Sequence, residues 1–330
     1  MTTRTVVLNP LGAALLHYRR ELVSVLEASG QPTDVLEFPE PSAGGGSRSR
    51  WVLRYVQALW ELRRRGRRPS RPARVVVTWP VLGYVDLLII AACLPGAWLT
   101  VHDPVPLVRS LGYGPVSRSF ARLLGRRARI IVLSEAAADE VRKALPAATL
   151  VLLPHPILEP EIGRSRPEDE VVRVLGQYKA DRDLDLLKSI AEDGAAGRYA
   201  ITGRGWPAVE GWHVDDRFVP EDELDDLIRS ASVVLIPYRR FFQSGIAVRC
   251  LELGTPVVGP RNSSLRALLA AHEELLAGER SADWTRAAGA AIDLSAEELH
   301  ELSRDARERA THLWAGFLNS LDEGPFASLR

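Results

Sequence analysis

Short β-branched runs alternate with longer amphipathic segments along most of this chain, and this alternation constrains the fold more than any other feature. The pattern predicts a strand at residues 5–10 (TVVLNP), a helix at 13–29 and a second strand at 33–38 (TDVLEF). Strands that are separated by a helix pair in parallel through right-handed βαβ units, and helices then cover both faces of the sheet. The sequence therefore predicts an α/β fold built on parallel sheets.

The alternation continues through the chain in two series. Further strands are predicted at 74–79, 97–101, 129–133, 149–153, 171–176, 198–203, 216–219, 232–237 and 255–259. Helices are predicted at 50–66 and from residues 181, 221 and 244, and only helices follow residue 282. Residues 41–50 (PSAGGGSRSR) are expected to form a flexible loop.

A segment without periodicity separates the two series. Residues 153–170 (LPHPILEPEIGRSRPEDE) contain four prolines, which is typical of a linker. A chain of 330 residues also suits two domains better than one. We therefore expect two doubly wound, Rossmann-like domains that face each other across a cleft, one over 1–157 and one over 170–307, with a linker at 158–169.

Composition narrows the functional class. The formal net charge is zero and the pI is about 7.1, so no overall field would recruit nucleic acid. Cys93 and Cys250 lie in apolar runs and are expected to be free thiols in a reducing compartment. The first residues lack the apolar core of a signal peptide, and Pro95 and Gly96 break the longest apolar run. We expect a soluble cytoplasmic protein, and its preference for Arg over Lys suggests a GC-rich bacterial genome.

The residues that directly follow the predicted strands are the candidates for chemistry, because ligands bind at the carboxyl ends of parallel strands. In the first series these residues are Gly12, then His102 and Asp103, and also Ser134, a predicted helix N-cap. In the second series they are Gly176, Lys179, Arg182, Gly203, Tyr238, Ser244 and Gly245. If the two domains face each other, all of these residues point into one cleft.

Two pairs of these residues predict sites for phosphate. Lys179 and Arg182 lie beside the predicted start of a helix, where two cations and free amides would hold phosphate. The alternative is a solvated helix start paired with neighbouring aspartates. Ser244 and Gly245 open another helix, whose amides and hydroxyl would add a second anion site.

Glu252, two turns further along that helix, is placed to accept both hydroxyls of a ribose. The alternative for Glu252 is an i, i+3 ion pair with Arg249 on a helix edge. For His102, the alternative to a functional role is a core histidine. His155 in the linker is expected to be structural or exposed.

Other sites find less support. The aspartates of DRDLDLL (residues 181–187) fall opposite its leucines, which favours a solvated helix face over a metal site. No Cys/His cluster has metal-ligand spacing. GRGWP (residues 203–207) lacks the third Gly and the acid of a dinucleotide fingerprint. Residues 50–74, with Trp51 and Trp60, are either the Arg-rich outer face of a sheet-covering helix or a peripheral contact with an anionic membrane.

In their order, the motifs of this chain resemble those of the retaining nucleotide-sugar glycosyltransferases of family 4, which have the GT-B fold. The resemblance spans nearly the whole chain and begins with the Gly-containing loop after the first strand. It continues through TVHDPVP, VLSEAAADEV, LLPHPI, GQYKADRDLDLL, ITGRG, DRFVPEDELDDLIRSASVVLIPY and SGIAVRCLELGTPVVGP, and ends at the aromatic HLWAGFL. The last motif resembles the closing helix of the family, about residues 308–330, which returns to the first, acceptor-side domain.

The resemblance implies roles for individual residues. Lys179 and Arg182 would hold the donor diphosphate, and Glu252 would hold the ribose. His102 would lie against the donor sugar, and it forms the predicted catalytic set with Lys179 and Arg182. The other predicted donor-binding residues are Gly12, Asp103, Gly176, Gly203, Phe218, Val219, Tyr238, Ser244 and Gly245, the backbone around Phe218 and Val219 framing the base. The family usually carries a sugar-contacting glutamate where this chain has Ser244.

The resemblance also implies an activity. We expect a hexosyltransferase that moves a sugar from a UDP- or GDP-sugar to an acceptor hydroxyl with retention and without a metal or other cofactor. The acceptor would be a glycan, a lipid-linked molecule or a small molecule, in the biosynthesis of polysaccharides, glycolipids or glycosylated metabolites. The alternatives are a nucleotide-sugar epimerase of the same architecture and a non-catalytic glycosyltransferase-like subunit.

Overall fold

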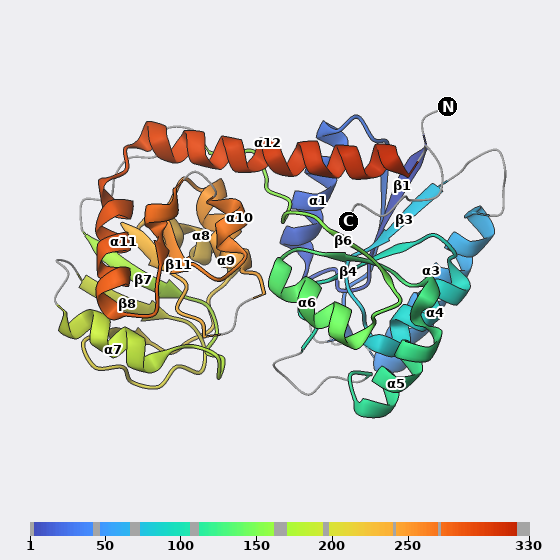
Figure 1. Ribbon diagram of the computed structural model, residues 1–330, viewed down its shortest axis with the longest axis horizontal. Coiled ribbons are helices and arrows are strands. Elements are labelled where there is room, and N and C mark those ends of the chain that lie inside the picture. The colour runs from blue at the N-terminus through green and yellow to red at the C-terminus, as the bar shows by residue number, and fades with distance from the viewer. Residues whose placement is uncertain are drawn as a thin grey trace. The chain divides into compact units, whose positions relative to one another are not determined.

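The computed structural model describes residues 3–41, 47–66, 73–105, 112–161, 170–193, 198–239, 242–269 and 272–321. The chain divides into two compact units (Figure 1). The first unit comprises residues 1–156 and 309–330, and the second comprises residues 157–308. Much of the predicted linker, residues 162–169, lies outside the described residues.

The first unit is a doubly wound α/β layer structure. It holds β1 (Arg4–Asn9), α1 (Leu16–Ala28), β2 (Thr33–Glu37), α3 (Arg48–Gly66), β3 (Ala73–Val77), α4 (Tyr84–Cys93), β4 (Trp98–Val101), α5 (Pro115–Leu124), η1 (Gly125–Arg127), β5 (Arg129–Val132), α6 (Glu135–Ala144) and β6 (Thr149–Leu152). Its six strands are all parallel, in the order β2-β1-β3-β4-β5-β6. The strand order reverses between β1 and β3, and such a switch point is where ligands bind in this kind of sheet.

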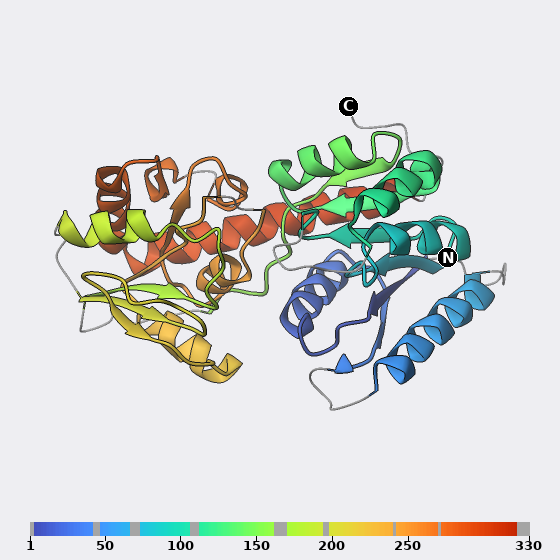
Figure 2. The same cartoon turned by 90° about the horizontal axis from the view of Figure 1, so that it is seen from below.

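The helices of the first unit cover both faces of its sheet. On one face, α1 packs with aromatic residues of the last helix, and Leu22, Trp98 and Trp314 are fully buried in that core. On the other face, α3, α4 and α5 lie side by side (Figure 2). The central strands are apolar and buried on both sides, which is why their sequences are nearly continuous β-branched runs, whereas the edge strands β2 and β6 are partly exposed.

The second unit repeats the same construction with a different strand order. It holds β7 (Val171–Leu175), α7 (Leu184–Glu192), β8 (Arg198–Thr202), β9 (His213–Asp215), α8 (Glu221–Arg229), β10 (Val233–Leu235), α9 (Gly245–Glu252), β11 (Val257–Pro260), α10 (Leu265–Leu268), η2 (Glu273–Leu275), β12 (Leu276–Ala277), α11 (Ser281–Asp293) and the first half of α12 (Ala296–Ser320). Its parallel strands run β12-β11-β10-β7-β8-β9, so the switch point lies between β7 and β10.

Several predicted boundaries were wrong. The short strand of this region is β9 at His213–Asp215, not residues 216–219. Helix α7 begins at Leu184 rather than at residue 181, because the side chain of Asp183 caps it. Helix α3 begins at Arg48, inside the predicted loop, of which residues 42–46 are not described. The N-cap at Ser134 is confirmed, since its side chain accepts from the Ala137 amide.

The short β12 precedes residue 282, and the described residues after it form the helices α11 and α12, as predicted. Helix α12 contributes to both units: residues 309–320 belong to the first unit, where Trp314 and Phe317 enter the core. In the part of the chain that the structure describes, no helix is long and apolar enough to cross a membrane.

Candidate functional site

Two glycines shape the carboxyl edge of the second sheet. Gly176 follows β7 with φ +92°, a backbone conformation that residues with a side chain rarely adopt. Gly203 follows β8, and a Cβ atom there would collide with the carbonyl oxygen of Gly176. The two strand ends therefore pack backbone against backbone, and the Gly176 turn opens beside the switch point. Both positions were predicted for the donor site.

Arg182 lies at this switch point as a buried cation. Its side chain is 4% exposed, and its Nη2 donates to the Leu175 carbonyl oxygen at 2.8 Å. Its Nε and Nη1 are buried and have no hydrogen-bond partner among the described residues. Burial lowers the pKa of Arg182 from its ordinary value, yet an Arg side chain stays charged in proteins. A buried cation with two bare N–H groups is a site that an anion would complete.

Aromatic rings hold this guanidinium in place. Its carbon lies 4.1 Å from the ring centre of Tyr238 and 5.3 Å from that of Trp206. Trp206 is fixed in turn, because its indole N–H donates to the Gly176 carbonyl oxygen at 2.8 Å. The sequence predicted Tyr238 but missed Trp206, although Trp206 directly follows the Gly-x-Gly turn after β8. A tryptophan just past a strand end was the available signal.

The loop that carries Lys179 and Arg182 is tied down by backbone bonds. The Arg182 amide donates to the Lys179 carbonyl oxygen at 2.9 Å, and the Asp183 amide donates to the Pro237 carbonyl oxygen at 2.9 Å. Lys179 is exposed, whereas Arg182, three residues later, is buried. The structure therefore gives the two cations different surroundings: Arg182 is fixed among aromatic rings, and Lys179 is solvated.

The amides at the start of α7 do not form an open anion site. The carboxylate of Asp183 accepts from the Leu186 amide at 3.2 Å, and Arg239 donates to the same carboxylate at 3.0 Å. The hydrogen bonds from Arg239 and the helix amide lower the pKa of Asp183, although burial opposes them. The expectation of free amides beside Lys179 and Arg182 was therefore wrong at this helix, because its own acid occupies the position.

The start of α9 is more open. Ser244 is the N-cap, and its Oγ accepts from the Ala247 amide at 3.2 Å. Among the described residues, a Cβ atom on Gly245 would meet nothing within 4 Å, so they leave the first turn of the helix uncovered at this point. The backbone amides of the first turn carry the positive end of the helix dipole. Ser244 and Gly245 thus form the expected helix start at the same sheet edge as Arg182.

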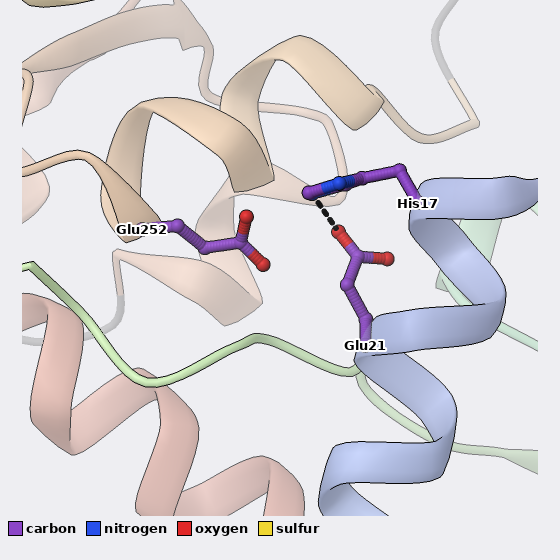
Figure 3. A group of neighbouring side chains, drawn as sticks. All are labelled: His17, Glu21 and Glu252. Carbon is purple, nitrogen blue, oxygen red and sulfur yellow. Dashed lines mark ion pairs between the residues drawn. The ribbon is translucent and has the colours of Figure 1, made fainter. Parts of the chain in front are cut away.

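Glu252 lies in the last turn of α9 (Figure 3), and its carboxylate is occupied. It is 1% exposed; its Oε1 accepts from the Leu158 amide at 2.8 Å and its Oε2 accepts from Arg249 at 2.9 Å. Burial lowers the pKa of Arg249, but its bonds to Asp225 and Glu252 outweigh this and raise the pKa overall. The i, i+3 ion pair that the sequence left open is therefore present. A ribose-binding role for Glu252 requires these bonds to open and stays a prediction.

Phe218 and Val219 follow β9 on a short segment that an ion-pair network fixes. Arg217 bridges Asp215 at 2.7 Å and Glu223 at 2.8 Å. The Phe218 ring is 74% exposed, an uncommon situation for a large apolar side chain. The predicted role of this segment, framing a base, is compatible with its exposure and remains a prediction.

In the first unit, His102 and Asp103 follow β4 as expected. His102 is 1% exposed, and its Nε2 lies 3.0 Å from the Thr78 carbonyl oxygen, so that nitrogen carries the proton. Its ring stacks on Trp79 with centroids 5.3 Å apart and meets the edge of Tyr18 at 4.4 Å. His102 is therefore a packed, oriented histidine, and its contact with a sugar remains a prediction.

The loop after β1 is held by a carboxylate that the sequence did not single out. The Gly12 amide donates to the Phe38 carbonyl oxygen at 3.1 Å, and a Cβ atom on Gly12 would lie 3.0 Å from that oxygen. The next two amides, of Ala13 and Ala14, donate to the Glu40 carboxylate at 3.1 Å and 2.9 Å. Gly12 therefore permits a close approach, but within its own unit.

Glu21 is a second acidic side chain that the sequence did not single out. It lies on α1, is 1% exposed, and its Oε1 is 3.1 Å from His17 Nε2 (Figure 3). Its Oε2 is 3.6 Å from Nδ1 of His155, which is itself buried. The signal was an acid on the apolar stripe of an amphipathic helix. Of the two predictions for His155, structural or exposed, its burial excludes the second.

Comparisons with known proteins show which solved structures share this architecture. The sequence matches no protein-family model and no curated protein. Solved structures do match. Sucrose-phosphate synthase from Thermosynechococcus elongatus is 13% identical over 97% of this chain and 98% of that one, with a TM-score of 0.60.

A trehalose-6-phosphate synthase structure is 11% identical over 98% of this chain and 100% of that one, with a TM-score of 0.62. A structure of a TarM mutant from S. aureus is 11% identical over 75% of this chain and 55% of that one, with a TM-score of 0.51. At such identities the likeness establishes the fold. With its two six-stranded parallel sheets, the chain is an α/β protein with the two-domain GT-B fold.

Proposed function

We propose that this protein is a glycosyltransferase that moves a sugar from a nucleoside-diphosphate sugar to an acceptor hydroxyl. The observation that carries the proposal is Arg182, a buried cation with two bare N–H groups at the switch point of the second sheet. A donor diphosphate would bring the missing negative charge and acceptor oxygens. The TarM structure was solved in complex with UDP, and a similar structure from E. coli is bound with UDP-2-fluoro glucose.

Desolvation explains why a diphosphate suits this position. Each N–H group that is left unsatisfied in a buried site costs about 1–3 kcal/mol, and more when the group is charged. Separate oxygens of a diphosphate would satisfy the Nε and Nη1 atoms of Arg182, because these two N–H groups lie on opposite edges of the guanidinium. Lys179, exposed and three residues away, would add a second charge, and the open first turn of α9 would add amides.

The proposed reaction follows from the position of these charges. The bond between the anomeric carbon and the diphosphate oxygen breaks, and negative charge grows on the leaving diphosphate. Arg182, Lys179 and the α9 start would stabilise that charge as it develops, where electrostatic stabilisation is most effective. The acceptor oxygen bonds to the anomeric carbon on the face that the diphosphate leaves, and the diphosphate takes the acceptor proton. Retention and independence of a metal are parts of this proposal.

Other residues take proposed roles around this centre. Gly176, Gly203 and Tyr238 would shape the phosphate pocket, and Phe218 and Val219 would frame the base. Glu252 would serve the ribose if its bond to Arg249 opened. In the first unit, Gly12, His102 and Asp103 would contact the donor sugar. A UDP- or GDP-hexose as donor, and a glycan, lipid-linked or small-molecule acceptor, complete the proposal, as does a place in polysaccharide or glycolipid biosynthesis.

The test is nucleotide binding followed by turnover. Isothermal titration with UDP and GDP, each with and without Mn²⁺, should show binding of one nucleotide that is unchanged by the metal. Lys179→Ala should weaken that binding at least tenfold, because a phosphate-facing charge is lost. Lys188→Ala is the matched control, since this exposed lysine of α7 pairs with Glu210 at 2.6 Å. Equal loss in both variants, or no nucleotide binding by the wild type, would contradict the proposal.

Turnover separates the alternatives. Incubation with UDP- and GDP-hexoses, followed by NMR, should show slow donor hydrolysis with release of the α-anomer from an α-linked donor. A change of sugar configuration while the nucleotide stays attached would instead identify an epimerase. Tight nucleotide binding without any sugar release would identify a non-catalytic subunit.

A further inference from the structure

Helix α5 buries very little of itself. Among its ten residues Ala121 is the buried one. Val116 is 69% exposed, Phe120 57%, Leu123 74% and Leu124 57%. These four side chains follow an i, i+4, i+7, i+8 spacing, so they form a single stripe on the helix surface. Contiguous exposed apolar side chains of this size mark an interaction surface rather than an ordinary solvated face.

A second helix of the same row, α3, also carries exposed apolar side chains. Helices α3, α4 and α5 lie in a row along one face of the first sheet (Figure 2). Helix α3 exposes Leu53, Val56 and Trp60, with Trp60 60% exposed. Its opposite stripe, which includes Tyr55, Leu59 and Leu62, is buried against the unit. Both helices at the ends of the row thus present an apolar face outwards, although α3 buries a full stripe and α5 buries only Ala121.

The charges beside these stripes are cationic. Residues 115–129, which span α5 and the turn after it, contain five arginines and no acid. Arg122 anchors the helix, because it donates to the Ala144 carbonyl oxygen at 3.2 Å, whereas Arg126 and Arg127 are exposed. Helix α3 ends in Arg63, Arg64 and Arg65, of which Arg65 pairs with Glu61. The guanidinium of Arg64 lies over the Trp60 ring at 4.4 Å.

We propose that the exposed faces of α5 and α3 form a docking surface for an anionic lipid membrane. Apolar side chains flanked by arginines suit the acyl and headgroup regions of such a membrane. The apolar side chains enter the boundary of the acyl chains, and the guanidinium groups contact the headgroup phosphates. Arg over Trp, as at Arg64 and Trp60, suits the interface between these layers. The association is peripheral, and it does not depend on the proposed glycosyl transfer.

The test is binding of the full chain to vesicles of defined composition. Flotation with vesicles of phosphatidylcholine and about 30 mol% phosphatidylglycerol should recover the protein, and vesicles of phosphatidylcholine alone should recover at least tenfold less. The double variant Phe120→Ser/Leu123→Ser should lower binding to the anionic vesicles at least tenfold. Arg126→Glu/Arg127→Glu should also lower it and should reduce its dependence on salt, because two headgroup contacts are lost.

Matched controls show whether the location matters. Leu313→Ser, at an exposed leucine of α12, and Val35→Ser, at an exposed valine of β2, should leave vesicle binding unchanged. Circular dichroism melting of each variant keeps misfolding separate from lost docking. The proposal is overturned if neutral and anionic vesicles bind alike, if the wild type binds neither, or if the controls lose as much as the α5 variant. It is also overturned if light scattering shows a dimer of the wild type that the α5 variant dissociates without any change in vesicle binding.

Discussion

The carboxyl edges of the two sheets differ in how their polar groups are satisfied. In the first unit, acids of the chain itself fill the loops: Glu40 accepts from the Ala13 and Ala14 amides, and Asp86 accepts from the Val81 amide at 2.7 Å. The group left without a partner among the described residues of this edge is neutral, the Nδ2 of Asn9 at the end of β1. In the second unit Asp183 likewise accepts from the Leu186 amide, but the group left without a partner among the described residues is a cation, because the buried Arg182 has two bare N–H groups. Both units have the same layered construction and parallel strands, so the difference lies in the side chains and not in the fold.

The difference indicates where a ligand belongs. A loop amide that donates to a buried carboxylate of its own chain already has its hydrogen bond. An incoming anion would have to displace that carboxylate. A buried guanidinium with bare N–H groups is in the opposite situation, because an anion adds bonds without breaking any. The second edge is therefore prepared for an anionic ligand, and the first edge is prepared to hold its own loops in one conformation.

The largest expected effect comes from removing the bare cation. Arg182→Met should weaken nucleotide binding at least 100-fold, since two charge-assisted hydrogen bonds to phosphate are worth about 3–5 kcal/mol together. The same variant without ligand should be no less stable than the wild type, because Met removes two unsatisfied buried N–H groups. Titration calorimetry and urea unfolding measure the two quantities. A large loss of stability with intact nucleotide binding would show that the cation is structural.

The next largest effect is a pH dependence of the unfolding free energy that comes from Asp86, at the carboxyl edge of the first sheet. Burial raises the pKa of Asp86 to about 6, although its hydrogen bonds from Tyr55 and from the Val81 and Leu82 amides lower it. Because the folded pKa lies above the unfolded value of 3.8, the native state binds the extra proton, and the stability falls as pH rises from about 4 to about 6.

This loss amounts to about 3 kcal/mol, at about 1.36 kcal/mol for each pKa unit. Asp86→Asn should remove this dependence, so that the difference in unfolding free energy between variant and wild type changes between about pH 4 and pH 7. Urea unfolding at the two pH values measures it, with the exposed Asp139→Asn as control. Parallel pH profiles for wild type and Asp86→Asn would contradict this account of the buried carboxyl.

The smallest expected change in stability comes from removing the carboxylate that accepts from the amides after β1. Glu40→Ala removes the acceptor of two amides and should lower the unfolding free energy by about 2 kcal/mol. It also uncovers the amides of Ala13 and Ala14, so inorganic phosphate should stabilise the variant more than the wild type. Thermal melting with phosphate up to about 50 mM, the range expected for a weak anion site, measures both. Equal phosphate effects on the two proteins would show that the carboxylate does not occupy an anion position.

The sequence predicted those parts of the fold and the site that depend on local patterns of apolar and polar residues. β-branched runs located the parallel strands, and the strand ends pointed to Arg182, Gly176 and His102. Partners that lie far apart in the chain could not be predicted. Glu40 reaches amides 26 and 27 residues away, and Trp206 reaches a carbonyl oxygen 30 residues away.

The start of α7 was missed for a related reason. Asp181 and Asp183 both precede its apolar run, and the choice between them as cap depends on backbone bonds to residues 237 and 239. Tertiary contacts decide which residue caps the helix, and the periodicity of the sequence carries no information about those contacts.

The last helix has a consequence for how this protein forms. Trp314, Phe317 and Leu318 complete the core beside α1, whose Leu22, Val25 and Leu26 are otherwise without that cover. During synthesis these three residues leave the ribosome about 160 residues after the final strand of the first unit, which ends at Leu152. The first unit must therefore wait, with one apolar face open, while the second unit folds. The core of the amino-terminal half of the protein is therefore completed only after α12 has been translated.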